Sequence, residues 1–113
     1  MNSKQKGSRG EREFASLCRE AGYDNARRGQ QFKGGNDSPD VEGLPRVHVE
    51  VKRVERLNIH DAMQQSIRDS EGRALPIVAH RRNGDKWMIT MQAEDWFALY
   101  REWDTSQMFS EVV

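Results

Sequence analysis

The sequence is poor in the residues that build cross-linked or membrane-embedded proteins. It contains one cysteine, Cys18, which excludes an internal disulfide and a cysteine-rich zinc site. No apolar run approaches the roughly 20 residues that a bilayer-spanning helix needs. Residues 1–9 are polar and basic and have no hydrophobic core, so they do not resemble a signal peptide. We therefore expect a protein of a reducing, intracellular compartment, with no membrane partner.

Repeats, low-complexity segments and histidine pairs with zinc-ligand spacing are also absent. His48, His60 and His80 form no H-x3-H pair, so neither a zinc site nor His-Asn-His nuclease chemistry is supported. The 113 residues, of which 35% are hydrophobic and 32% charged, fit one globular domain. We expect this domain, residues 1–113, to have loose ends at about residues 1–6 and 106–113.

The formal net charge is zero, which argues against a protein that coats DNA along its whole surface. The charge is uneven, because residues 1–35 hold eight Lys or Arg against four Asp or Glu. Such a segment would suit a polyanionic partner. Charge alone, however, favours an ordinary solvated surface.

The pattern of apolar residues predicts an α/β protein with the element order αβββαββα. Helices are predicted at residues 8–21, 58–70 and 93–103, and strands at 25–32, 40–42, 46–54, 74–80 and 86–91. Ser8 and Glu11 form a capping box at the first helix. Pro76 indicates that the fourth strand lies at a sheet edge or begins one residue later. Three strands followed by a helical crossover suggest a mixed sheet of about five strands flanked by helices.

The predicted strand 46–54 carries the pattern with the most chemical information. Its side chains alternate between an apolar face (Val47, Val49 and Val51) and a polar face (His48, Glu50 and Lys52). Taken alone, an E-x-K pair is a weak motif, since an exposed ion pair explains it. Asp40 follows Ser38-Pro39 and precedes Glu50 by ten residues. The turn Gly43-Leu44-Pro45 would bring these two carboxylates together.

Two converging carboxylates repel each other unless a cation lies between them, and Mg²⁺ prefers such oxygen ligands. We predict that Asp40 and Glu50 hold Mg²⁺, with Mn²⁺ as a substitute. Lys52 would hold a water or stabilise developing charge. Glu11 is a fourth candidate, because it shares a helix face with Phe14 and should point at the sheet, toward the metal or its water. Helix capping with Ser8 is the competing role for Glu11.

The run Lys6-Gly7-Ser8-Arg9-Gly10-Glu11-Arg12 resembles the K-G-S-x-x-E-R opening of archaeal Holliday junction resolvases, which are dimeric PD-(D/E)xK nucleases. The resemblance covers about residues 6–103 in pattern. It implies a restriction-endonuclease-like core in which Glu11 is the early helix glutamate, Asp40 the aspartate, and Glu50-Val51-Lys52 the E-x-K element. It also implies that the backbone carbonyl of Val51 is a metal ligand.

On this resemblance, the protein is expected to hydrolyse DNA phosphodiesters at branched or four-way junctions, inside a prokaryotic or archaeal cell or one infected by the encoding phage. A domain of this size cannot place one site on two opposed strands, whereas a two-fold homodimer can. Two alternatives stay open: another PD-(D/E)xK activity, such as a nicking, restriction-like or repair nuclease, and a catalytically silent DNA-binding domain. Intact Asp40, Glu50 and Lys52 weigh against silence.

Candidate DNA contacts come from the basic first third of the chain: Lys6, Arg9, Arg27, Arg28, Gln30 and Lys33. A solvated surface accounts for them almost as well. Four further polar residues are candidates with simpler roles: Gln64 and Gln65 as polar helix surface, Asp37 as a turn residue rather than a second ligand, and His48 as a solvated side chain rather than one near the metal.

The aromatic residues are predicted to serve the core or an interface. Trp87, Trp96 and Trp103 fit either role. We expect the helix at 93–103 to pack one side on the sheet, which would leave Tyr100 or Trp103 for a partner subunit.

Overall fold

A computed structural model describes residues 3–29 and 38–112, with side chains from residue 7 onward. The elements are α1 (Ser3–Glu20), β1 (Arg27–Arg28), β2 (Val41–Glu42), β3 (Val47–Arg53), α2 (Ile59–Ser70), β4 (Leu75–Arg81), β5 (Met88–Thr90) and α3 (Ala93–Val112). This order is the predicted one. Among these helices, none combines the length and apolar character that crossing a membrane requires.

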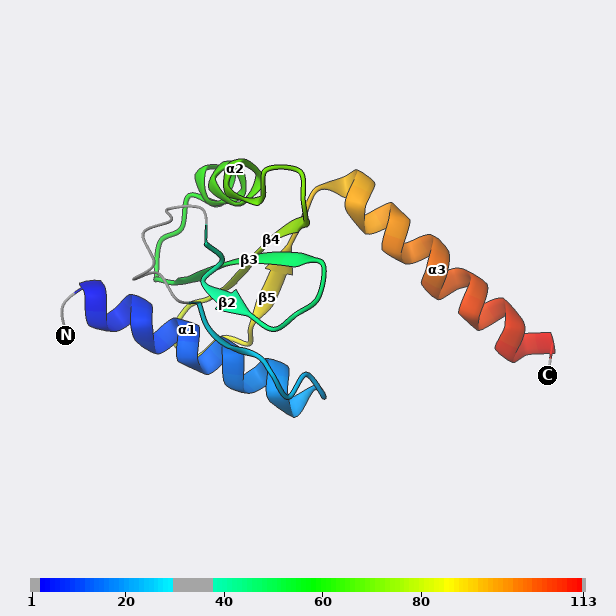
Figure 1. The fold of residues 1–113 in the computed structure, drawn as a ribbon, viewed down its shortest axis with the longest axis horizontal. Coiled ribbons are helices and arrows are strands. Elements are labelled where there is room, and N and C mark those ends of the chain that lie inside the picture. The colour runs from blue at the N-terminus through cyan, green and yellow to red at the C-terminus, as the bar shows by residue number, and fades with distance from the viewer. Residues whose placement is uncertain (1–2, 30–37, 113) are drawn as a thin grey trace.

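The five strands form one mixed sheet in the order β1-β2-β3-β4-β5. β3 and β4 are parallel and joined through α2, whereas the other neighbouring pairs are antiparallel. Helices α1 and α2 lie on opposite sides of this sheet (Figure 1). The architecture confirms the predicted fold class, a mixed sheet flanked by helices.

Helix α1 begins at Ser3 rather than at Ser8. Ser8 therefore lies inside the helix, where backbone amides already have helical partners, and the predicted capping box of Ser8 and Glu11 is wrong. The face that carries Phe14 and Cys18 is buried against the sheet, as the spacing predicted. The lone cysteine is thus a core residue.

Both faces of β3 are buried. Val49 and Val51 belong to the core cluster beneath α1. On the opposite face His48 is 4% exposed and Glu50 is 2% exposed. Helix α2 covers this face, and Ser66 donates hydrogen bonds to backbone carbonyls of β3 and β4. An exposed strand ion pair, the ordinary reading of the E-x-K pattern, is therefore excluded.

Strand β4 lies inside the sheet, between β3 and β5, so the edge position suggested by Pro76 is wrong. The strand begins at Leu75, one residue after Ala74, which confirms the other alternative that Pro76 indicated. The Leu75 amide donates to the Arg46 carbonyl beside β3. Successive residues of a strand point their backbone groups to alternate edges, so Pro76 faces the β5 side. Strand β5 pairs only with Val78 to His80, and no ladder bond is lost at Pro76.

Helix α3 extends to Val112, well past the predicted end at Trp103, and none of its residues is buried. It leads away from the sheet in Figure 1, so the expected packing of one side on the sheet is wrong. Its rings contact one another instead: Trp96 stacks on Tyr100 at 5.0 Å between centroids, and Tyr100 lies 5.8 Å from Trp103. The looseness expected for residues 106–113 stays a prediction.

Candidate functional site

The turn between β2 and β3 places Asp40 beside the E-x-K segment. The Asp40 amide donates to the Val49 carbonyl at 2.8 Å, and the Asp40 carboxylate Oδ2 accepts from the Val51 amide at 2.8 Å. The Asp40 carboxylate is thereby held on the backbone between Glu50 and Lys52. The antiparallel pairing of β2 with β3 thus brings together Asp40 and Glu50, which are ten residues apart in the sequence.

Helix α1 carries Glu11 to the same place. Glu11 is 8% exposed, and its Oε2 accepts a hydrogen bond of 2.6 Å from Arg28 Nε. Gly10 allows the close approach of the helix to β3, because a Cβ on Gly10 would lie 2.8 Å from the Cβ of Arg53. Gly10 therefore allows α1 to lie close to β3, and the next residue, Glu11, brings its carboxylate to the site.

We expect Gly10→Ala to destabilise the protein, although alanine favours a helix by about 1 kcal/mol over glycine. The added methyl group must push α1 from β3, and such overpacking costs about 1–3 kcal/mol. Gly7→Ala is the matched control, because nothing lies within 4 Å of a Cβ at that position of the same helix. Thermal unfolding should show a lower melting temperature for Gly10→Ala and an unchanged or higher one for Gly7→Ala. A higher value in both would contradict close packing of α1.

A cavity of about 460 Å³ joins these side chains. Its lining residues are Gly7, Glu11, Asp40, Glu50, Val51, Lys52, Arg53, Val54 and Gln65. Every residue predicted from the sequence as catalytic or metal-binding is in this set. Gln65 lines it too, although polar helix surface was the simpler interpretation, whereas Gln64 is exposed. Asp37 lies outside the described residues.

Burial makes the carboxyl groups of Asp40 and Glu50 reluctant to ionise. It raises the pKa of Asp40 to about 6, although the hydrogen bond from the Val51 amide acts in the opposite direction. Burial, followed by the negative charge of Asp40, raises the pKa of Glu50 to about 8 despite the nearby Lys52. Without a cation, Glu50 is therefore mostly protonated at neutral pH.

The donor set suits a hard divalent cation. Asp40, Glu50 and Glu11 offer carboxylate oxygens that line the same cavity, and a cation would offset their mutual repulsion. The Val51 amide points at Asp40, and the carbonyl of the same residue points to that edge, beyond the paired residues of β2. Its oxygen therefore faces the same edge of β3 as the Asp40 carboxylate.

The predicted DNA contacts are only partly described. The described ones are in ion pairs: Arg9 with Glu13, Arg27 with Glu42, and Arg28 with Glu11. The side chain of Lys6 and the residues Gln30 and Lys33 lie outside the described part of the chain. Arg28 is therefore tied directly to the cavity through Glu11.

A network around Glu13 was missed from the sequence. Its carboxylate lies 2.9 Å from Arg53 Nε and 3.2 Å from Arg81 Nη1. Arg53 also lines the cavity, so this network adjoins the cavity at that residue. The available signal was the position of Arg53 directly after Lys52 in the strand.

No family model matches this sequence, and a search of curated proteins also finds no match. Among solved structures, the chain is similar to Hjc, a Holliday junction resolvase from the archaeal hyperthermophile Archaeoglobus fulgidus, with a TM-score of 0.55. The match covers 76% of this chain and 72% of that chain, at 24% identity. The chain has the fold of an archaeal Holliday junction resolvase. The resemblance indicated by the run from Lys6 to Arg12 is confirmed at the level of the fold.

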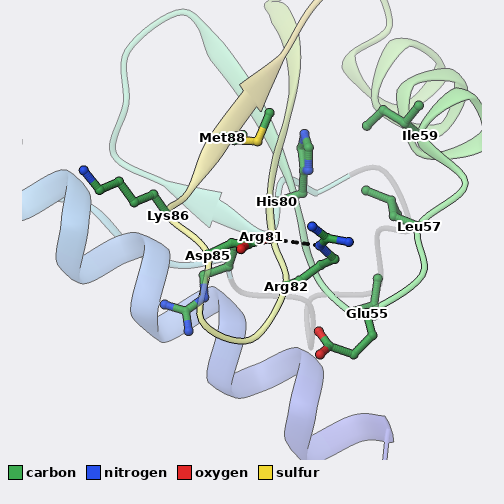
Figure 2. Close-up of a pocket in the computed structure, with 10 residues that line it drawn as sticks. Glu55, Leu57, Ile59, His80, Arg81, Arg82, Asp85, Lys86 and Met88 are labelled. Atoms are coloured by element: carbon green, nitrogen blue, oxygen red, sulfur yellow. Dashed lines mark hydrogen bonds and ion pairs between the residues drawn. The ribbon is translucent and has the colours of Figure 1, made fainter.

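A second cavity, of about 330 Å³, adjoins the first in this resolvase fold, and Val54 lines both. Figure 2 shows Arg82 paired with Asp85, at 2.9 Å between Nε and Oδ2, with Leu57 on the other side of the cavity. No group of metal ligands gathers there among the described residues. The second cavity therefore extends the hollowed surface beside the first cavity.

Because α2 covers β3, it also brings Asp69, which the sequence analysis did not connect to the site, close to the polar face of β3. His48 was expected in solvent, which is wrong because α2 packs over it. Asp69, near the end of α2, lies close to His48 and Glu50. Asp69 has no motif or spacing that signals this proximity, because it depends on the path of α2 across the resolvase-like sheet.

Proposed function

We propose that this protein is a metal-dependent endonuclease that hydrolyses DNA phosphodiesters, with branched or four-way junctions as its substrate. The convergence of Glu11, Asp40, Glu50 and Lys52 at one cavity of a resolvase fold carries the proposal. The name of the similar archaeal protein supports junction DNA. The whole chain, residues 1–113, would act as one nuclease domain inside the cell.

The proposed roles concern the five cavity residues that the sequence pointed to as catalytic or metal-binding. Asp40, Glu50 and the Val51 carbonyl would hold Mg²⁺, or Mn²⁺ in its place, which supplies Lewis-acid polarisation and a more acidic water. Lys52 would orient the attacking water and stabilise negative charge on the phosphate oxygens. Glu11, fixed by Arg28, would orient that water from the opposite element, α1.

Cationic side chains around the cavity would hold the DNA backbone. Arg28 binds Glu11 of the cavity, Arg53 lines the cavity, and Arg9 and Arg27 are exposed. Lys6, Gln30 and Lys33 complete the proposed set of DNA contacts. Exchange of a surface carboxylate for a phosphate loses little energy, because exposed ion pairs contribute about 0–1 kcal/mol.

The test compares a four-way junction with a linear duplex of the same sequence, each incubated with chelator-treated protein and then with Mg²⁺. We expect paired nicks in the junction, no cleavage of the duplex at the same concentration, and no cleavage in excess chelator. Cleavage that persists in chelator contradicts the metal-dependent mechanism. Equal cleavage of both substrates indicates another PD-(D/E)xK activity, and no cleavage with Mg²⁺ or Mn²⁺ indicates a silent DNA-binding domain.

Glu11→Gln tests whether the glutamate serves the reaction. The helix begins at Ser3, so capping no longer accounts for Glu11, and glutamine can still accept from Arg28. We expect the single-turnover cleavage rate at saturating protein to fall by at least about tenfold, because a charged water-orienting group is lost. The matched control is Arg28→Gln, which removes the same ion pair but keeps the Glu11 carboxylate. Equal losses in both variants would limit Glu11 to positioning Arg28.

The raised pKa values predict how Mg²⁺ and pH act together on stability. Glu50 has a pKa of about 8 in the folded protein against an ordinary value of 4.5. Between these two pKa values the folded chain therefore holds a proton on Glu50 that the unfolded chain has released. Without a cation, the free energy of unfolding consequently falls as pH rises through this range. Mg²⁺ must displace that proton, so its binding strengthens as pH rises.

Saturating Mg²⁺ should consequently raise the melting temperature more at pH 8 than at pH 6. When Mg²⁺ binding displaces one proton, the affinity for Mg²⁺ changes by up to about 100-fold over two pH units. In a small domain this corresponds to a difference of about 5 °C or more between the two melting-temperature shifts. Glu50→Gln is the control, since it removes the titrating group and should show a small shift at both pH values. An equal shift at both pH values in the unchanged protein would contradict the site.

We also propose a homodimer formed through the aromatic surface of α3, defined by Trp96, Phe97, Tyr100 and Trp103. These side chains are 40–57% exposed, and an apolar surface of this kind marks a protein interface. The helix carries five acidic residues against one arginine, a charge that repels DNA. A second copy of the chain fits because a resolvase must make two matched nicks with two sites.

A further inference from the structure

His48, Glu50 and Asp69 bring their ligand atoms within 4.8 Å of one another, between β3 and α2. His48 and Glu50 are two residues apart on one face of β3, so the strand fixes their side chains in parallel. Asp69 reaches them from the last turn of α2. His48 and Glu50 are buried, and the side chain of Asp69 is 12% exposed.

The surroundings of this cluster concentrate negative charge. Asp40 and Glu11 add to the charge that acts on Glu50, and Lys52 is the nearby cation that opposes it. Arg68 lies 3.9 Å from Asp69, but its side chain is 71% exposed and contributes little there. One imidazole and two carboxylates between packed elements therefore form a set that an added cation would stabilise.

We propose that His48, Glu50 and Asp69 form a second cation site, which binds a divalent transition metal and is distinct from the oxygen-lined site at Asp40. The imidazole nitrogen decides the class of metal, since Zn²⁺, Mn²⁺ and Co²⁺ accept nitrogen ligands that Mg²⁺ disfavours. The two sites share Glu50 and no other side chain. Variants of Asp69 and of Asp40, which are not shared, therefore test the two sites separately.

A metal at this site has a structural consequence. Two of its ligands belong to β3 and one to α2, so the ion cross-links the sheet to the helix that covers it. Any ion that binds the folded chain alone stabilises it in proportion to the logarithm of its free concentration. The ion would also fix the position of the Glu50 carboxylate, which lies near Asp40 as well.

The test uses the full chain without a histidine tag, stripped of metal and kept in millimolar Mg²⁺ so that the oxygen-lined site is filled. Co²⁺ is added, its visible absorption is followed, and thermal unfolding is measured in parallel. We expect one Co²⁺ per chain with the absorption of a nitrogen-containing site and a raised melting temperature. His48→Gln and Asp69→Asn should each weaken this binding by more than about tenfold.

Two control variants distinguish binding at this site from binding elsewhere on the chain. His60→Gln removes an exposed imidazole from α2 and should leave Co²⁺ binding unchanged. Asp40→Asn removes a ligand of the oxygen-lined site and should retain the Co²⁺ spectrum. Absence of Co²⁺ binding in the unchanged protein overturns the proposal, as does binding that Asp69→Asn leaves intact. If His48→Gln fails to fold, the result with Asp69→Asn decides whether the second cation site exists, because this substitution lies at the margin of the core.

Discussion

Asp40→Asn should lower the rate of junction cleavage by on the order of a thousandfold or more while junction binding is kept or tightened. Asparagine retains an oxygen that can accept from the Val51 amide, so the turn between β2 and β3 should persist. The substitution removes one negative metal ligand and one charge that repels the phosphate of the bound strand. Chemistry and binding are thus expected to change in opposite directions.

Single-turnover cleavage and a gel-shift titration in Ca²⁺ would measure these two effects. Asp61→Asn is the control, because Asp61 is an exposed aspartate in the first turn of α2, away from the cavity. That variant should cleave at the rate of the unchanged protein. A folded Asp40→Asn protein that loses junction affinity, or that cleaves at the normal rate, would mean that the site lies elsewhere.

Replacing Trp96, Tyr100 and Trp103 together by serine should raise the dissociation constant of the dimer by more than about 100-fold. Buried aromatic anchors of an interface contribute about 2 kcal/mol or more each. These rings lie on a helix in which no residue is buried, so the folded subunit does not depend on them. Paired nicks in a junction should become single, uncoupled nicks, because each monomer carries one proposed catalytic site.

Sedimentation equilibrium at micromolar concentrations would follow the dissociation. Tyr23→Ser is the matched control, because it removes an aromatic ring that is 50% exposed but lies after α1, away from the aromatic surface of α3. The control should leave the dimer intact. A chain that is strictly monomeric, alone and on junction DNA, would replace the resolvase proposal by a nicking or single-strand nuclease.

Local patterns in the sequence were sufficient for the elements and for much of the candidate site. The period of two in β3 places Glu50 and Lys52 on one face, and the short return from Asp40 fixes its distance from Glu50. The helical period of α1 points Glu11 at the sheet with Phe14. Each of these relations joins residues of one element or of neighbouring strands, so the geometry of the backbone alone determines it.

Relations between distant elements were decided by the tertiary structure. The approach of Asp69 to His48 and the pairing of Arg28 with Glu11 depend on how α2 and β1 lie against β3 and α1. Strand β4 can lie inside the sheet because β5 ends before it reaches Pro76, so no hydrogen bond between the strands is lost at Pro76. The sequence by itself determined which residues can share a face and the αβββαββα order. Only packing decided which faces meet, because the burial of a face depends on the surface that another part of the chain presents to it.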